Sequence, residues 1–139
     1  MKTPLPLIAL CIAFTVTFPG CSKEDAADKK VNVPAMMAAL KSDNKETRDD
    51  ACAELAKAGP RAKNAVPLLI PLLKDKDPVS RRLAAYVLGE IGPDAKSALP
   101  ALKELLNDTD REVLKQVGNS LRSIDPKSYS DLKNENIAY

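Results

Sequence analysis

The sequence predicts an all-α fold, a right-handed α-solenoid of about three two-helix repeats within residues 33–131. Three observations support this prediction. The same residue types return every 33 positions, the apolar residues of each unit follow helical spacing, and no stretch alternates as a half-buried strand does. A pair of short helices cannot bury both its faces alone, so neighbouring pairs stack into a solenoid.

Residues 1–20 have the form of a secretory signal peptide. Lys2 is followed by an uncharged, mainly apolar run that ends at Gly20 and is short for a membrane-spanning helix. The Gly20-Cys21 boundary is similar to a bacterial lipobox. Phe18 and Pro19 differ from the aliphatic and small residues that are usual in a lipobox. The resemblance implies that Cys21 is lipidated. We therefore expect an exported lipoprotein, anchored at the cell envelope on the outer membrane or the periplasmic face.

Residues 21–32 follow as a short segment of charged and small side chains, which predicts a flexible tether. Three repeats are then expected at residues 33–65, 66–98 and 99–131, with a tail at 132–139. No insertion or deletion is needed to align them. The coinciding positions include Val33, Val66 and Leu99; Leu40, Leu73 and Leu106; Ala51, Ala84 and Val117; and Leu55, Leu88 and Leu121.

The middle repeat shows the expected elements most clearly. Its apolar spacing predicts a first helix over about 66–74, and Pro71 should either kink this helix or push its regular start downstream. Asp77 before Pro78 is typical of an N-cap, and the second helix is expected over about 78–91. Gly92-Pro93 should end it, because glycine suits a left-handed cap and proline cannot continue. A short capping helix is expected at about 127–133.

The segment Asp77–Ala95 (DPVSRRLAAYVLGEIGPDA) resembles a HEAT repeat of the short bacterial type, and the likeness extends more loosely over residues 33–131. In that family an aspartate in the turn and an arginine on the second helix form a ladder along the solenoid. Asp77 and Arg81 match both positions. The first repeat keeps Arg48 but has asparagine at the turn, whereas Asp110 in the last repeat has Leu114 in place of the arginine, so the ladder should break there.

Composition excludes several classes of function. The chain has no histidine, which removes histidine-based triads and metal sites, and no cofactor is expected. It has 21 Lys+Arg against 19 Asp+Glu and few aromatic residues, so nucleic acid is not an expected partner. Three cysteines give no disulfide framework once Cys11 leaves with the signal peptide and Cys21 carries lipid.

Three groups of residues invite a chemical interpretation. The stripe Glu46, Asp50 and Glu54 is spaced for a cation site or an acid–base pair, but a solvated face is favoured, since Arg48 and Lys57 offset its charge. Cys52 aligns with Ala85 and Gly118, which favours a small residue at a tight helix contact over a reactive thiol. The basic residues of the second helices favour a solvated surface over an anion-binding strip; they are Arg81, Arg82, Arg111, Lys115 and Arg122.

Tyr86 is predicted to point away from the core, with Val79 and Leu83 on the same flank and Arg82 at the rim. The equivalent positions of the other repeats carry mainly polar residues and form no apolar patch. The alternative is that Tyr86 is buried between neighbouring repeats, and its solvent exposure decides between the two interpretations. A tyrosine has a large apolar body and a polar tip, which suits an interface anchor.

The function predicted from the sequence is therefore non-catalytic: a lipid-anchored interaction or scaffold module that binds a protein partner. Two alternatives stay open. A lyase-type enzyme, as among HEAT-like relatives, would need a deep apolar pocket and a nucleophile, for which Cys52 is the one candidate. A purely structural envelope spacer would need neither a pocket nor an exposed patch.

Overall fold

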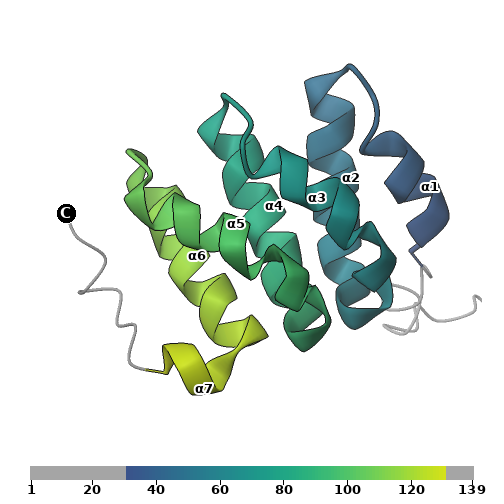
Figure 1. Ribbon diagram of the computed structural model, residues 1–139. Helices are drawn as coiled ribbons and strands as arrows, with labels where there is room; N and C mark the ends of the chain where they lie inside the picture. Colours follow the sequence, from purple (N-terminus) through teal and green to yellow (C-terminus); the bar gives the residue numbers. More distant parts are fainter. Residues whose placement is uncertain (1–30, 131–139) are drawn as a thin grey trace, which may run out of the picture.

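A computed structural model describes residues 31–130, and these residues form a right-to-left row of stacked helix pairs in the view of Figure 1. The described residues are helical with short turns and contain no strand, which confirms the predicted all-α solenoid. The α-helices are α1 (Val33–Ala39), α2 (Lys45–Ala58), α3 (Val66–Leu72), α4 (Pro78–Ile91), α5 (Leu99–Glu104), α6 (Arg111–Ile124) and α7 (Pro126–Tyr129).

The second helices α2, α4 and α6 build one layer of the solenoid. Each is fourteen residues long, and each begins 33 positions after its predecessor. The middle helix α4 packs on α2 on one side and on α6 on the other, while α1, α3 and α5 form the second layer (Figure 1). The predicted second helix at 78–91 is confirmed at both ends.

Side-chain caps fix where the second helices begin. The Asn44 side chain accepts a hydrogen bond from the Glu46 backbone N–H, Asp77 accepts from that of Ser80, and Asp110 accepts from two N–H groups of the first turn. These bonds satisfy amides that have no partner within the helix. The predicted N-cap role of Asp77 is confirmed.

The ends of the second helices differ from the prediction in one respect. Gly59 and Gly92 have positive φ (54° and 73°), but their ψ of −131° and −141° lies outside the left-handed helical region. Backbone with this combination of positive φ and negative ψ is nearly restricted to glycine. It turns the chain directly into the 3₁₀ segments Gly59–Ala65 and Gly92–Ala98, which connect each repeat to the next.

The short helices also differ from the prediction in length. α3 ends at Leu72 rather than near residue 74, and Pro71 sits in its last turn without displacing its start. α5 passes into a 3₁₀ turn, Leu105–Asn107. The predicted terminal helix is present as the short α7, but residues 131–133 of the predicted span lie outside the described residues.

The core lies between the two helix layers. The equivalent leucines Leu55, Leu88 and Leu121 are fully buried. The second helices approach closely because small residues stand where they meet: Cys52, Ala85 and Gly118 are all buried, as their alignment predicted. Across the α4–α6 contact the Ser120 hydroxyl donates to the Ala85 carbonyl at 2.6 Å.

Candidate functional site

An apolar patch lies on the outward face of α4. Tyr86 is 41% exposed and Val79 is 40% exposed, and these are the large apolar side chains that are exposed among residues 31–130. Leu83 is half-buried beside them and packs against the core, and Arg82 is also half-buried. The Tyr86 ring is therefore not enclosed between repeats.

The α4 helix places these side chains outward because its other faces are used for packing. Ala85 and Val87 are fully buried, and Ala84 and Leu88 are buried in the core. With 3.6 residues per turn, Tyr86 between these positions is left facing solvent. The equivalent outward positions of the neighbouring second helices carry mainly polar side chains; they are Glu46, Asp50 and Ala53 on α2, and Glu112, Gln116 and Asn119 on α6.

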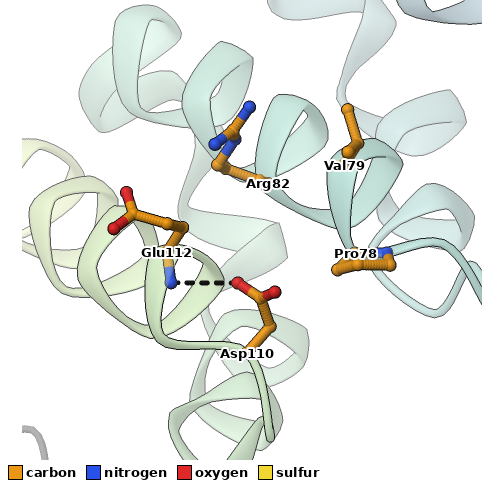
Figure 2. Close-up of a pocket in the computed structure, with 5 residues that line it drawn as sticks. All are labelled: Pro78, Val79, Arg82, Asp110 and Glu112. Atoms are coloured by element: carbon orange, nitrogen blue, oxygen red, sulfur yellow. Dashed lines mark hydrogen bonds between the residues drawn. The ribbon is translucent and has the colours of Figure 1, made fainter.

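Next to this patch the beginnings of α4 and α6 enclose a shallow hollow of about 80 Å³. Pro78 and Val79 supply its apolar side from α4, and Asp110 and Glu112 line it from α6 (Figure 2). Arg82 projects from α4 and Glu112 from α6, so one helix gives the hollow a cationic border and the other an anionic border. This hollow is too small to enclose a substrate, and it makes the surface beside Val79 slightly concave.

The predicted ladder is present, but its aspartates are not those named from the sequence. Arg81 donates to Asp108 of the next repeat through two bonds of 2.7 and 2.9 Å. Arg48 lies 3.7 Å from Asp75 of the next repeat. Asp77 instead pairs with Lys45 at 2.9 Å, and Asp110 serves as the N-cap of α6. The prediction of Asp77 and Asp110 as ladder residues is therefore wrong.

The reason is how the turn carboxylates are oriented. Asp77 and Asp110 direct their oxygens to the first-turn amides of their own helices. Asp75 and Asp108, two positions earlier, each accept from the backbone N–H of the cap residue, and this bond holds the carboxylate toward the preceding repeat. Because Asp75 and Asp108 lie 33 positions apart, the same periodicity contained a signal for them.

The arginines hold their own turns as well. Arg48 donates to the Ser42 and Asp43 carbonyls, and the next-repeat equivalent Arg81 donates to the Asp75 and Lys76 carbonyls. The series ends at both limits of the array. The first repeat has Ser42 where the later repeats have the ladder aspartate, and the last has Leu114 in place of arginine, as the sequence predicted.

These contacts shift the ionisation of the groups involved. Burial acts to raise the pKa of Asp108, but bonds from Arg81 and from the Asp110 backbone N–H outweigh it, so the pKa lies below the ordinary value. The bond to Asp108 raises the pKa of Arg81. On the surface, the bond between Lys45 and Asp77 lowers the pKa of the carboxyl and raises that of the amine.

The acidic stripe on α2 does not assemble into a metal centre. Glu54 pairs with Lys57 at 2.6 Å, and Glu46 and Asp50 are exposed. Among residues 31–130, no three metal-ligating side chains come together. Of the basic residues on the second helices, Arg81 belongs to the ladder and Arg122 donates to Asn119 on its own helix.

Cys52 has the environment of a packing residue. Its side chain is 1% exposed, and burial raises its pKa to about 12, with the charge of Asp49 acting in the same direction. The nucleophilic form of cysteine is the thiolate, so both effects suppress reactivity near neutral pH. Cys21 lies outside the described residues.

One contact near the C-terminal end was not predicted. The Lys103 ammonium lies 5.5 Å from the centre of the Tyr129 ring, which helps to hold α7 against α5. No sequence pattern marked this pair, because neither residue type recurs at the equivalent positions of the other repeats.

Residues 33–125 match the family of HEAT repeats, and the chain belongs to that family. Members of this family commonly mediate protein–protein interaction or scaffolding. The structure is also similar to the crystal structure of an engineered protein, with a TM-score of 0.58 and 27% identity over 66% of this chain and 44% of the other. The chain thus spans less than half of that protein's length. No curated protein matches this sequence.

Proposed function

We propose that this protein is a non-catalytic interaction module that binds another protein through the outward face of α4. The observation that carries the proposal is the exposure of Tyr86 and Val79 on the central second helix. Binding hot spots are enriched in tyrosine and cluster at the centre of an interface, where a surrounding rim excludes water. Leu83 adds apolar area to this centre, and Arg82 with Glu112 supplies a charged border.

A lyase-type enzyme is the less favoured function. Its one candidate nucleophile, Cys52, is buried, and burial raises its pKa. Cys52 lines neither the hollow of about 80 Å³ beside Val79 nor the larger hollow of about 410 Å³ between α1 and α2, so the one candidate nucleophile faces no site for a substrate. A structural spacer with no ligand would not need the apolar patch on α4.

We also propose that the module is held at the cell envelope by lipid on Cys21. The sequence supports this through the uncharged run that ends at Gly20-Cys21 and the charged segment 22–30 that follows. No helix within residues 31–130 is long and apolar enough to cross a membrane. Attachment would then depend on the amino-terminal lipid, and stable anchoring needs more than one acyl chain.

The binding proposal is tested by Tyr86→Ala in a crosslinking capture from cell envelopes. Tyr86→Phe is the conservative comparison, because it keeps the ring, and Ser123→Ala on the exposed face of α6 is the matched control. The alanine variant should lower partner affinity by about tenfold or more and leave the melting temperature nearly unchanged. Equal capture by all three variants would refute the role of Tyr86.

The anchor is tested separately with Cys21→Ser. This variant should leave the membrane fraction or stay unprocessed, while the wild-type mature protein should begin at a lipid-modified Cys21 in mass spectrometry. An unmodified mature Cys21 would refute the anchor without affecting the α4 proposal.

A further inference from the structure

A second apolar hollow lies at the amino-terminal end of the solenoid, apart from the Tyr86 patch. Its volume is about 410 Å³. An apolar cavity of about 150 Å³ already holds a benzene-sized group, so this hollow has room for several apolar side chains. Its lining comes from α1 and α2: Met36, Ala39, Thr47, Asp50, Ala51, Ala53 and Glu54.

The repeat explains why this hollow exists. The positions equivalent to Thr47 and Glu54 are Ser80 and Val87 in α4, which are 3% and 0% exposed. In these later repeats this part of the face lies against the preceding second helix: the Ser80 hydroxyl reaches Asp49 of α2 at 3.1 Å, and α6 likewise packs on α4. The positions equivalent to Asp50 and Ala53 are Leu83 and Tyr86, which lie on the outward side of α4. The first repeat has no predecessor among the described residues, so its equivalent face is open.

The hollow has an apolar floor and an acidic border. Ala51 is 1% exposed, whereas Met36 and Ala39 are only half-buried. Part of the apolar floor therefore stays in contact with water. Asp50 and Glu54 stand at the border, one turn apart on α2. Lys57 pairs with Glu54, but both side chains are more than 40% exposed, and such surface pairs exchange at little cost.

We propose that this hollow binds an amphipathic helix of another protein, with apolar side chains on the floor and lysine or arginine beside Asp50 and Glu54. A helix is inferred because the positions equivalent to Thr47 and Glu54 are buried where a neighbouring second helix packs, in both α4 and α6. Basic residues are inferred from charge complementarity with the two border carboxylates. The site is independent of the Tyr86 patch.

Two other occupants fit less well. A second copy stacked head to tail would bring Leu114 against Ser42, and neither side chain can make the arginine–aspartate pair that joins consecutive repeats. The chain's own segment 22–30 has basic residues, but its apolar side chains are only Ala26 and Ala27, which cannot fill the floor.

The hollow can be tested by methyl NMR of the full-length protein, because two neighbouring methionines report on different surfaces. Met36 lines this hollow, whereas Met37 lines a separate one with Pro34 and Leu68. The probe is a synthetic helix of about 15 residues, with leucine and alanine on one face and lysines beside it. A peptide with glutamate in place of every lysine is the control.

The lysine peptide should shift the Met36 methyl signal saturably and leave Met37 unchanged, and the glutamate peptide should not bind. Asp50→Lys and Glu54→Lys should each weaken binding by about fivefold. Asp94→Lys, an equal charge change at an exposed position outside both hollows, should leave it unchanged. Tyr86→Ala should also bind normally, which separates this result from the α4 proposal.

Several results would overturn the inference. These are no binding, equal binding of the glutamate peptide, or a shift confined to Met37. A Met36 shift that depends on protein concentration without peptide would identify a second copy as the occupant. A Met36 shift on deletion of residues 22–30 would identify the chain's own segment.

Discussion

The ion pair between Arg81 and Asp108 should be the strongest polar link between consecutive repeats. The Arg81 side chain is 14% exposed and that of Asp108 is 5% exposed, and two short bonds join them. Removing one partner of a buried pair costs about 3–5 kcal/mol, whereas an exposed pair contributes about 0–1 kcal/mol. In Arg81→Ala the carboxylate keeps the bond from the Asp110 backbone N–H. We therefore expect a loss of about 2–3 kcal/mol.

The first repeat supplies a matched control in Arg48→Ala. Arg48 and Arg81 each donate to two carbonyls of their own turn, so both substitutions remove those bonds. The two sites differ in the ion pair, because Arg48 has one contact of 3.7 Å to Asp75, with side chains 19% and 24% exposed. Its pair should contribute less than about 1 kcal/mol.

Urea and thermal unfolding of both variants measures the difference. Arg81→Ala should lower the melting temperature by about 10–20 °C and Arg48→Ala by much less, since 1 kcal/mol shifts a domain of this size by about 4–8 °C. A double-mutant cycle with Asp108→Ala should show coupling between the two residues. Equal destabilisation by Arg48→Ala and Arg81→Ala would show that the carbonyl bonds, and not the ion pair, stabilise the array.

Three further predictions follow from the same structure. The pKa of Asp108 is lowered in the folded state, so this carboxylate contributes fully to stability above the pKa of an unfolded aspartate, about 3.9, and the contribution is lost as pH falls below that value. The free energy of unfolding, measured as pH is lowered, should show this loss in the wild type and less of it in Arg81→Ala. Gly92→Ala should destabilise the protein by about 1–3 kcal/mol through backbone strain alone, since φ is 73° and an added Cβ would lie 4.0 Å from the Ser123 carbonyl oxygen, an ordinary contact. An unchanged melting curve would contradict the strain. Cys52 should resist thiol reagents in the native protein and react only at the rate of unfolding. Fast labelling without urea would show that the helix packing around Cys52 opens in the native state.

The sequence determined the architecture because the determinants of a repeat are local. Helical spacing, a capping side chain and a glycine–proline end recur every 33 residues, and each acts within its own unit. These signals placed α4 at its observed bounds and set Tyr86 on the outward face, since the direction of a side chain on a helix follows from its position in the turn.

Only the tertiary structure decided which groups meet across repeats. Asp75 and Asp77 are both turn aspartates, and spacing alone does not say which one faces Arg48 and which one caps the helix. That choice depends on the hydrogen bond from the Asp77 N–H, which orients Asp75 toward the preceding repeat. The amino-terminal hollow has the same origin. Glu54 and its equivalent Val87 occupy the same position on their helices, but Val87 is buried and Glu54 is open, because burial depends on whether a neighbouring repeat covers that face.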